Sequence, residues 1–109
     1  MKIKKQKVIK IKFDFLTANV YIITRKKDLK IMKNKFKDSY ISFKHDKNFV
    51  GISSGDGYKN YIYIKDASVA TLAHEALHII QRICDRTGMV DEEVKCYMLH
   101  YIIEQVIGE

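Results

Sequence analysis

Residues 66–88, DASVATLAHEALHIIQRICDRTG, form the stretch that decides the fold. Apolar residues recur every three or four positions in it, a spacing that predicts an amphipathic helix. Asp66 or Ser68 can cap its N-terminus, and Gly88 suits its C-terminus, so we expect the helix to run to about Arg86. The predicted apolar side holds Val69, Leu72, Ala73, Ala76, Leu77, Ile79, Ile80, Ile83 and Cys84.

The polar side of this helix carries a His-Glu-x-x-His pattern formed by His74, Glu75 and His78. The two histidines are four residues apart, so their imidazoles lie one turn apart and can converge on one point. Zinc needs such convergence, with a Zn–N distance of about 2.0–2.1 Å to each ring. Glu75 lies on the flank of the pair, where it suits a base acting on a metal-bound water better than a ligand. The alternative is an ordinary solvated helix face.

A catalytic zinc takes three protein ligands and keeps one position open, so a third ligand is needed. A second helix is predicted from Asp91 to about Ile107, with an acidic first turn that favours the positive end of the helix dipole. Residues 87–90 should then form a return loop rather than a tight hairpin. The candidates for the third ligand are Asp85, Asp91, Glu92, Glu93 and His100.

Helical phase favours Glu93 among these candidates. Glu93 shares a polar stripe with Tyr97, His100 and Glu104 on an otherwise apolar helix. A metal-binding cleft would place polar groups next to that stripe. Glu92 is the alternate ligand, and an ordinary first-turn acid is the other interpretation of Glu93.

The N-terminal half predicts strands rather than long helices. Its alternating or β-branched segments are residues 8–15, 19–24, 40–43, 49–53 and 61–64, with turn residues at 54–60. Asp28 can cap a short helix that places Leu29, Met32 and Phe36 on one side. We therefore predict one α+β domain over residues 1–109, with a small antiparallel sheet in residues 1–65 and two long helices in residues 66–109.

The charge of the chain is unevenly distributed. Residues 1–50 carry a net charge of +11 and residues 51–109 a net charge of −4, which sum to +7. A basic half is consistent with weak nucleic-acid binding or with a lysine-rich solvated surface. The sequence shows no apolar run of about 18 residues and no signal peptide, so we expect a cytoplasmic protein without a membrane partner.

The residues HEALH at 74–78, followed by EVKCY at 93–97, resemble the zincin metallopeptidases of the gluzincin kind. The nearest likeness is to small single-domain zincin-like proteins of phages and prophages. The resemblance covers about residues 60–107. It implies a Zn²⁺ cofactor held by His74, His78 and Glu93, and a peptide or protein substrate.

The expected function is therefore that of a zinc-dependent hydrolase, specifically a metallopeptidase that uses a metal-bound water with Glu75 as general base. Tyr97, His100 and Arg82 are candidate donors to the developing oxyanion. A strand edge near residues 49–53 is a candidate seat for an extended substrate.

Two other functions compete with hydrolysis. One is a non-catalytic zincin-like module that binds a host or phage protein. The other is a basic nucleic-acid-binding module, which is less favoured because the basic half has one Arg and its aromatics alternate inward. We expect Cys84 in the core, Cys96 between the helices and His45 in a solvated loop.

Overall fold

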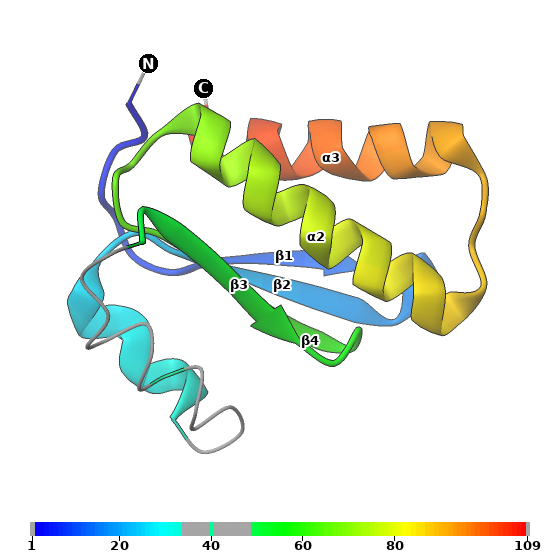
Figure 1. Ribbon diagram of the computed structural model, residues 1–109, viewed down its shortest axis with the longest axis horizontal. Helices are drawn as coiled ribbons and strands as arrows, with labels where there is room; N and C mark the ends of the chain where they lie inside the picture. The colour runs from blue at the N-terminus through cyan, green and yellow to red at the C-terminus, as the bar shows by residue number, and fades with distance from the viewer. Residues whose placement is uncertain (1, 34–39, 41–48, 109) are drawn as a thin grey trace.

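A single sheet with two long helices on one face makes up the α+β fold, as predicted (Figure 1). The computed structural model describes residues 2–33, 40 and 49–108. The strands are β1 (Ile9–Phe13), β2 (Ala18–Ile23), β3 (Gly51–Gly55) and β4 (Lys59–Ile64). The helices are η1 (Asp14–Leu16) and η2 (Lys26–Met32), both 3-10, followed by α2 (Val69–Thr87) and α3 (Glu92–Ile107).

The sheet is mixed, so the prediction of an antiparallel sheet is wrong at its centre. The strand order is β1-β2-β4-β3, in which β1–β2 and β3–β4 are antiparallel but β2–β4 is parallel. The central strands β2 and β4 therefore join the β1–β2 hairpin to the β3–β4 hairpin. A parallel pair is favoured where both faces of the sheet are covered. Here β4 is buried from Asn60 to Ile64, so the parallel pair lies where that condition is met.

Each face of the sheet contributes to a separate hydrophobic core. Ile62 and Ile64 of β4 face the helices, in a core that includes Leu72 and Ile79 of α2. The alternate residues Tyr61 and Tyr63 face the other side. There they pack with Ile23, Leu29 and Met32. The short YIYI run therefore serves both cores, because successive side chains of a strand point to opposite faces.

The first strand is shorter than expected. It ends at Phe13, and η1 then leads to Thr17, whose φ of 50° turns the chain towards β2. Phe15, which the alternating pattern assigned to the buried face, is exposed as a result.

The helix predicted near Asp28 is the 3-10 helix η2. Leu29 and Met32 are buried as expected, but Asp28 does not cap it. Its carboxylate accepts a hydrogen bond from Arg25 Nε at 2.7 Å, so Asp28 fixes the entry of the helix through a side-chain pair. The predictions for Phe36, for residues 41–43 and for His45 lie outside the described residues.

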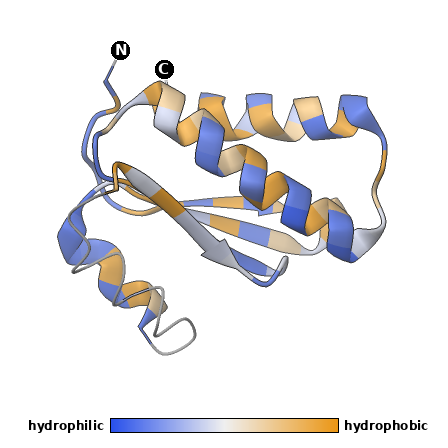
Figure 2. Cartoon of the chain, in the orientation of Figure 1, coloured by the Kyte–Doolittle hydropathy of each residue, from blue (hydrophilic) through white to orange (hydrophobic). Residues whose placement is uncertain are grey.

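The ends of α2 and α3 are where the sequence predicted them. The Ser68 side chain accepts hydrogen bonds from two backbone N–H groups of the first turn of α2. Gly88 ends that helix with a φ of 73°, a left-handed conformation that favours glycine. Asp91 caps α3 in the same way as Ser68 caps α2. Hydrophilic residues recur on successive turns of α2, with hydrophobic residues between them (Figure 2).

The two cysteines have different environments. Cys84 is buried in the main core as predicted, whereas Cys96 is exposed, so the prediction that it packs between the helices is wrong. The buried stripe of α3 includes Met98, and Cys96 lies about 160° around the helix from it. In the described parts of the chain, no helix combines the length and the apolar character that a membrane span requires.

Candidate metal site

His74 and His78 converge as a metal-binding pair requires. Their Nε2 atoms are 3.3 Å apart, and the ring planes are inclined by 76°. Two nitrogens that each lie about 2.05 Å from one tetrahedral zinc ion are about 3.3 Å apart. The spacing of the pair therefore fits a shared zinc ion.

Glu75 lies on the flank of this pair and is much less accessible than the histidines. Its Oε2 is 3.9 Å from Nε2 of His74. Its side chain is 12% exposed, against 68% for His74. Helix α2 therefore presents two solvent-facing nitrogens with one recessed carboxylate beside them.

Strand β3 forms the wall on the Glu75 side. It is an edge strand of the sheet, paired with β4. A Cβ on Gly51 would lie 2.2 Å from Cγ2 of Thr71 and 3.5 Å from Cγ of Glu75. The absence of a side chain at Gly51 thus allows the strand to approach α2 directly beside Glu75. The strand edge predicted near residues 49–53 does lie next to the candidate site.

A hydrogen bond to Asp66 fixes the orientation of the Thr71 side chain. Its hydroxyl donates to Oδ2 of Asp66 at 2.9 Å, and Asp66 Oδ1 accepts from the Ser68 N–H at 3.0 Å. This small network joins the start of α2 to the wall of the site. It was not predicted as part of the site, although Asp66 was singled out as a possible cap.

Two shallow hollows border the histidine pair. One, of about 330 Å³, is lined by Val50, Ala70, Thr71, His74 and Glu75. The other, of about 340 Å³, is lined by His74, Leu77, His78 and Gln81. His74 lies between them and lines both.

Leu77 was predicted on the apolar side of the helix, and that prediction is wrong. It is 54% exposed. The buried residues of α2 centre on Leu72, Ala76 and Ile83, and Leu77 lies about 100° around the helix from Ala76. Its position between the two histidines in sequence was the signal that it belongs to the site surface.

Glu93 lies apart from the histidine pair. It lines a hollow of about 510 Å³ along α3 together with Cys96, Tyr97, His100, Tyr101 and Glu104. Lys95 Nζ donates to Gln81 Oε1 of α2 at 3.4 Å. The Lys95 side of α3 therefore faces α2, and Glu93, two residues earlier and about 160° around the helix, faces away.

Glu92 lies on the side of α3 that faces α2, but its position along the helix axis is less favourable. It is three residues before Lys95 and shares its side of α3, yet it lies about 4.5 Å further along the axis, away from His78. Within residues 2–33, 40 and 49–108, no three His, Cys, Asp or Glu side chains are grouped closely enough to hold a metal ion. The third ligand therefore stays a prediction for either residue.

The three candidate oxyanion donors lie on two different helices. The His100 ring nitrogen contacts the carboxylate of Glu104. The ring centroids of Tyr97 and Tyr101 are 6.1 Å apart with the planes tilted by 37°, so Tyr97 and His100 both belong to the outer side of α3. Arg82 lies on α2, one turn after His78. Its Nη1 is buried and has no hydrogen-bond partner in the described structure.

Comparison with known proteins adds no relative to this geometry. A scan against protein-family models and searches of curated proteins and of solved structures found no match.

Proposed function

We propose that the chain is a zinc-dependent metallopeptidase in which His74 and His78 bind the metal and Glu75 is the general base. The observation that supports this most directly is the 3.3 Å separation of the two Nε2 atoms, with the Glu75 carboxylate beside them. That separation matches two nitrogens on one tetrahedral ion. Without zinc the same separation allows an N–H···N hydrogen bond between the two neutral rings, so metal content is the measurement that distinguishes the two states.

Zinc bound at this pair supplies a Lewis acid that polarises a carbonyl and acidifies water near it. Glu75 then has the simplest role, which is to accept the proton of the attacking water and return it to the leaving amine. Its recessed carboxylate belongs to a side chain that lies beside β3, where a Cβ on Gly51 would come within 3.5 Å of the Glu75 Cγ. Arg82, whose buried Nη1 has no hydrogen-bond partner among the described residues, is the donor on the same helix that suits the developing oxyanion.

The proposed substrate-binding surface is the wall formed by β3. An extended peptide can lie along the edge of a sheet and use main-chain hydrogen bonds for affinity. The hollow lined by Val50, Ala70 and Thr71 then receives one substrate side chain next to Glu75. Because that hollow is mainly apolar at Val50 and Ala70, a small apolar side chain is the expected occupant.

The experiment measures zinc content and peptidase activity in the wild type and in four single variants. The wild type should hold one zinc per chain. His78→Ala should lose it, because a single imidazole on an exposed helix face binds zinc weakly. Glu75→Gln should keep the zinc and lose cleavage of a casein-derived peptide library.

Glu93→Gln and Glu92→Gln locate the third ligand. The variant that removes a true ligand should bind zinc more than tenfold more weakly, and the other should match the wild type. If the wild-type protein still holds no zinc after purification and incubation with sufficient zinc, the metal assignment is contradicted. Equal cleavage by Glu75→Gln and wild type would contradict the role of the base.

The alternative function is a zincin-like module that binds a protein without cleaving it. The exposure of His74 and the shallowness of the two flanking hollows favour it, since a hydrolase gains from a site that excludes water. Zinc binding that persists without cleavage of any peptide in the library would support this alternative.

A further inference from the structure

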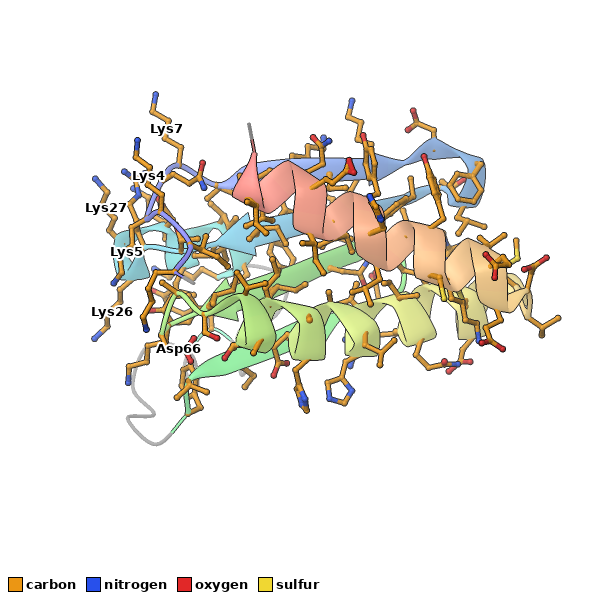
Figure 3. All side chains as sticks on the ribbon, turned by 90° about the horizontal axis from the view of Figure 1, so that it is seen from above. Lys4, Lys5, Lys7, Lys26, Lys27 and Asp66 are labelled. Atoms are coloured by element: carbon orange, nitrogen blue, oxygen red, sulfur yellow. The ribbon has the colours of Figure 1, made fainter. Side chains whose placement is uncertain are left out.

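Five lysines gather at one end of the molecule (Figure 3). Lys4, Lys5 and Lys7 come from the N-terminal segment, and Lys26 and Lys27 from η2 (Figure 3). All five are exposed. We call these five residues the lysine patch.

The fold brings the two parts of the patch together through one buried threonine. Thr24, at the end of β2, is 1% exposed. Its hydroxyl accepts from the Gln6 N–H at 2.8 Å and donates to the Gln6 carbonyl at 3.0 Å. Gln6 lies between Lys5 and Lys7 in sequence, and Thr24 comes two residues before Lys26. The two hydrogen bonds therefore hold the N-terminal lysines beside those of η2.

The acids near the patch form no ion pair with its lysines in the described structure. Asp28 is paired with Arg25. The carboxylate of Asp66 accepts hydrogen bonds from the Ser68 N–H and the Thr71 hydroxyl. Among the described residues, none of the five lysine side chains makes an ion pair. The patch therefore presents five positive charges at one end of the molecule, and these charges repel one another in the absence of an anionic partner.

The composition of the patch favours one class of partner. A specific protein interface has an apolar centre from which charged residues are depleted, and stable attachment to a membrane surface needs inserted apolar side chains. On the N-terminal segment and η2, the described residues include one exposed large apolar side chain, Ile31, which is 41% exposed. Lysines without an apolar centre suit a regular array of phosphates, since binding then comes from release of counterions.

We infer that the lysine patch binds the phosphate backbone of duplex nucleic acid without sequence preference. The lysines contribute point charges, and Arg25, the arginine beside them, is already engaged by Asp28. The expected contacts are therefore mainly to the phosphates, which position a protein on the duplex without reading its sequence. This inference is independent of the metal site.

The salt dependence follows from the number of charges. Each neutralised phosphate contributes a slope of about −0.9 to log K against log salt, so five contacts give about −4.5. The affinity should then fall about 500-fold between 50 and 200 mM salt. With three lysines removed, the slope should be about −1.8 and the fall about 12-fold.

The test measures fluorescence anisotropy of a labelled 20-base-pair DNA duplex of mixed sequence, titrated with protein in metal-free buffer. The patch variant carries Lys5→Gln, Lys7→Gln and Lys27→Gln. The control variant carries Lys10→Gln, Lys12→Gln and Lys59→Gln and removes the same charge. Lys12 and Lys59 both pair with Asn19, at the end of β2 opposite to Thr24.

The patch variant should lose most of the affinity and the salt slope, while the control stays within about threefold of the wild type. Equal losses in the two variants would show that net charge alone matters and would overturn the inference. So would binding of the wild type to vesicles containing a quarter phosphatidylserine but not to the duplex. His78→Ala should bind the duplex like the wild type, so a failed metal site and a failed patch give different results.

Discussion

Gly51→Ala tests whether β3 approaches α2 as closely as the structure shows. A methyl group at this position would lie 2.2 Å from Cγ2 of Thr71, well inside van der Waals contact. It would also lie 3.3 Å from the Tyr63 carbonyl oxygen and 3.5 Å from Cγ of Glu75. The Thr71 methyl is therefore the principal obstacle, and it cannot rotate away without breaking the bond of its hydroxyl to Asp66.

The sign of the effect is diagnostic. Where the backbone tolerates it and space is open, Gly→Ala stabilises a protein by about 0.4–1 kcal/mol, because it restricts the unfolded chain. Overpacking a tight contact costs about 1–3 kcal/mol instead. For 109 residues the unfolding entropy near the melting temperature is about 0.23 kcal/mol/K, so this cost lowers Tm by about 4–13 °C.

The companion variant is Thr71→Ser, which removes Cγ2 but keeps the hydroxyl that donates to Asp66. The double variant should recover most of the free energy of unfolding lost by Gly51→Ala, with a coupling of about 1 kcal/mol or more. Urea denaturation followed by circular dichroism measures all four proteins. A Gly51→Ala protein as stable as the wild type, or a double variant no better than the sum of the singles, would refute the close approach.

Two further predictions concern residues outside the site. Arg86→Lys should lower the free energy of unfolding by about 1–3 kcal/mol, measured by urea titration. The guanidinium donates hydrogen bonds to the backbone carbonyls of Leu16 and Gly57 and lies 3.8 Å from the centroid of the Tyr58 ring. A lysine cannot reproduce these contacts. Arg82→Lys, which breaks no hydrogen bond in the described structure, is the control, and an equal loss there would contradict the explanation. In the native protein at pH 8, iodoacetamide should modify Cys96 only, since burial raises the pKa of the Cys84 thiol and shields it. Intact-mass spectrometry should show one adduct before denaturation and two after it, and two adducts in native buffer would contradict the burial of Cys84.

The features that the sequence predicted well are local. Ser68, Gly88 and Asp91 end their helices by bonds or backbone angles that involve residues a few positions away. The approach of His74 to His78 is likewise a property of one helical turn. Such features need no knowledge of the rest of the fold.

The features that the sequence could not predict depend on contacts between distant elements. Helical phase grouped Glu93 with Tyr97, His100 and Glu104, and these residues do line one hollow. Phase within α3 carries no information about which side of the helix faces α2, however. That orientation follows from the packing of Met98 and its neighbours and from the contact of Lys95 with Gln81.

The parallel pairing of β2 with β4 has a consequence for how the chain folds. Asn19 pairs with Lys59, 40 residues later, so a long loop must close before the centre of the sheet exists. Each flanking hairpin, in contrast, forms from residues close in sequence and can appear first. During synthesis β1 and β2 therefore emerge long before their central partner, and the apolar face of the sheet stays uncovered until α2 follows. We expect sheet completion rather than helix formation to limit the folding rate.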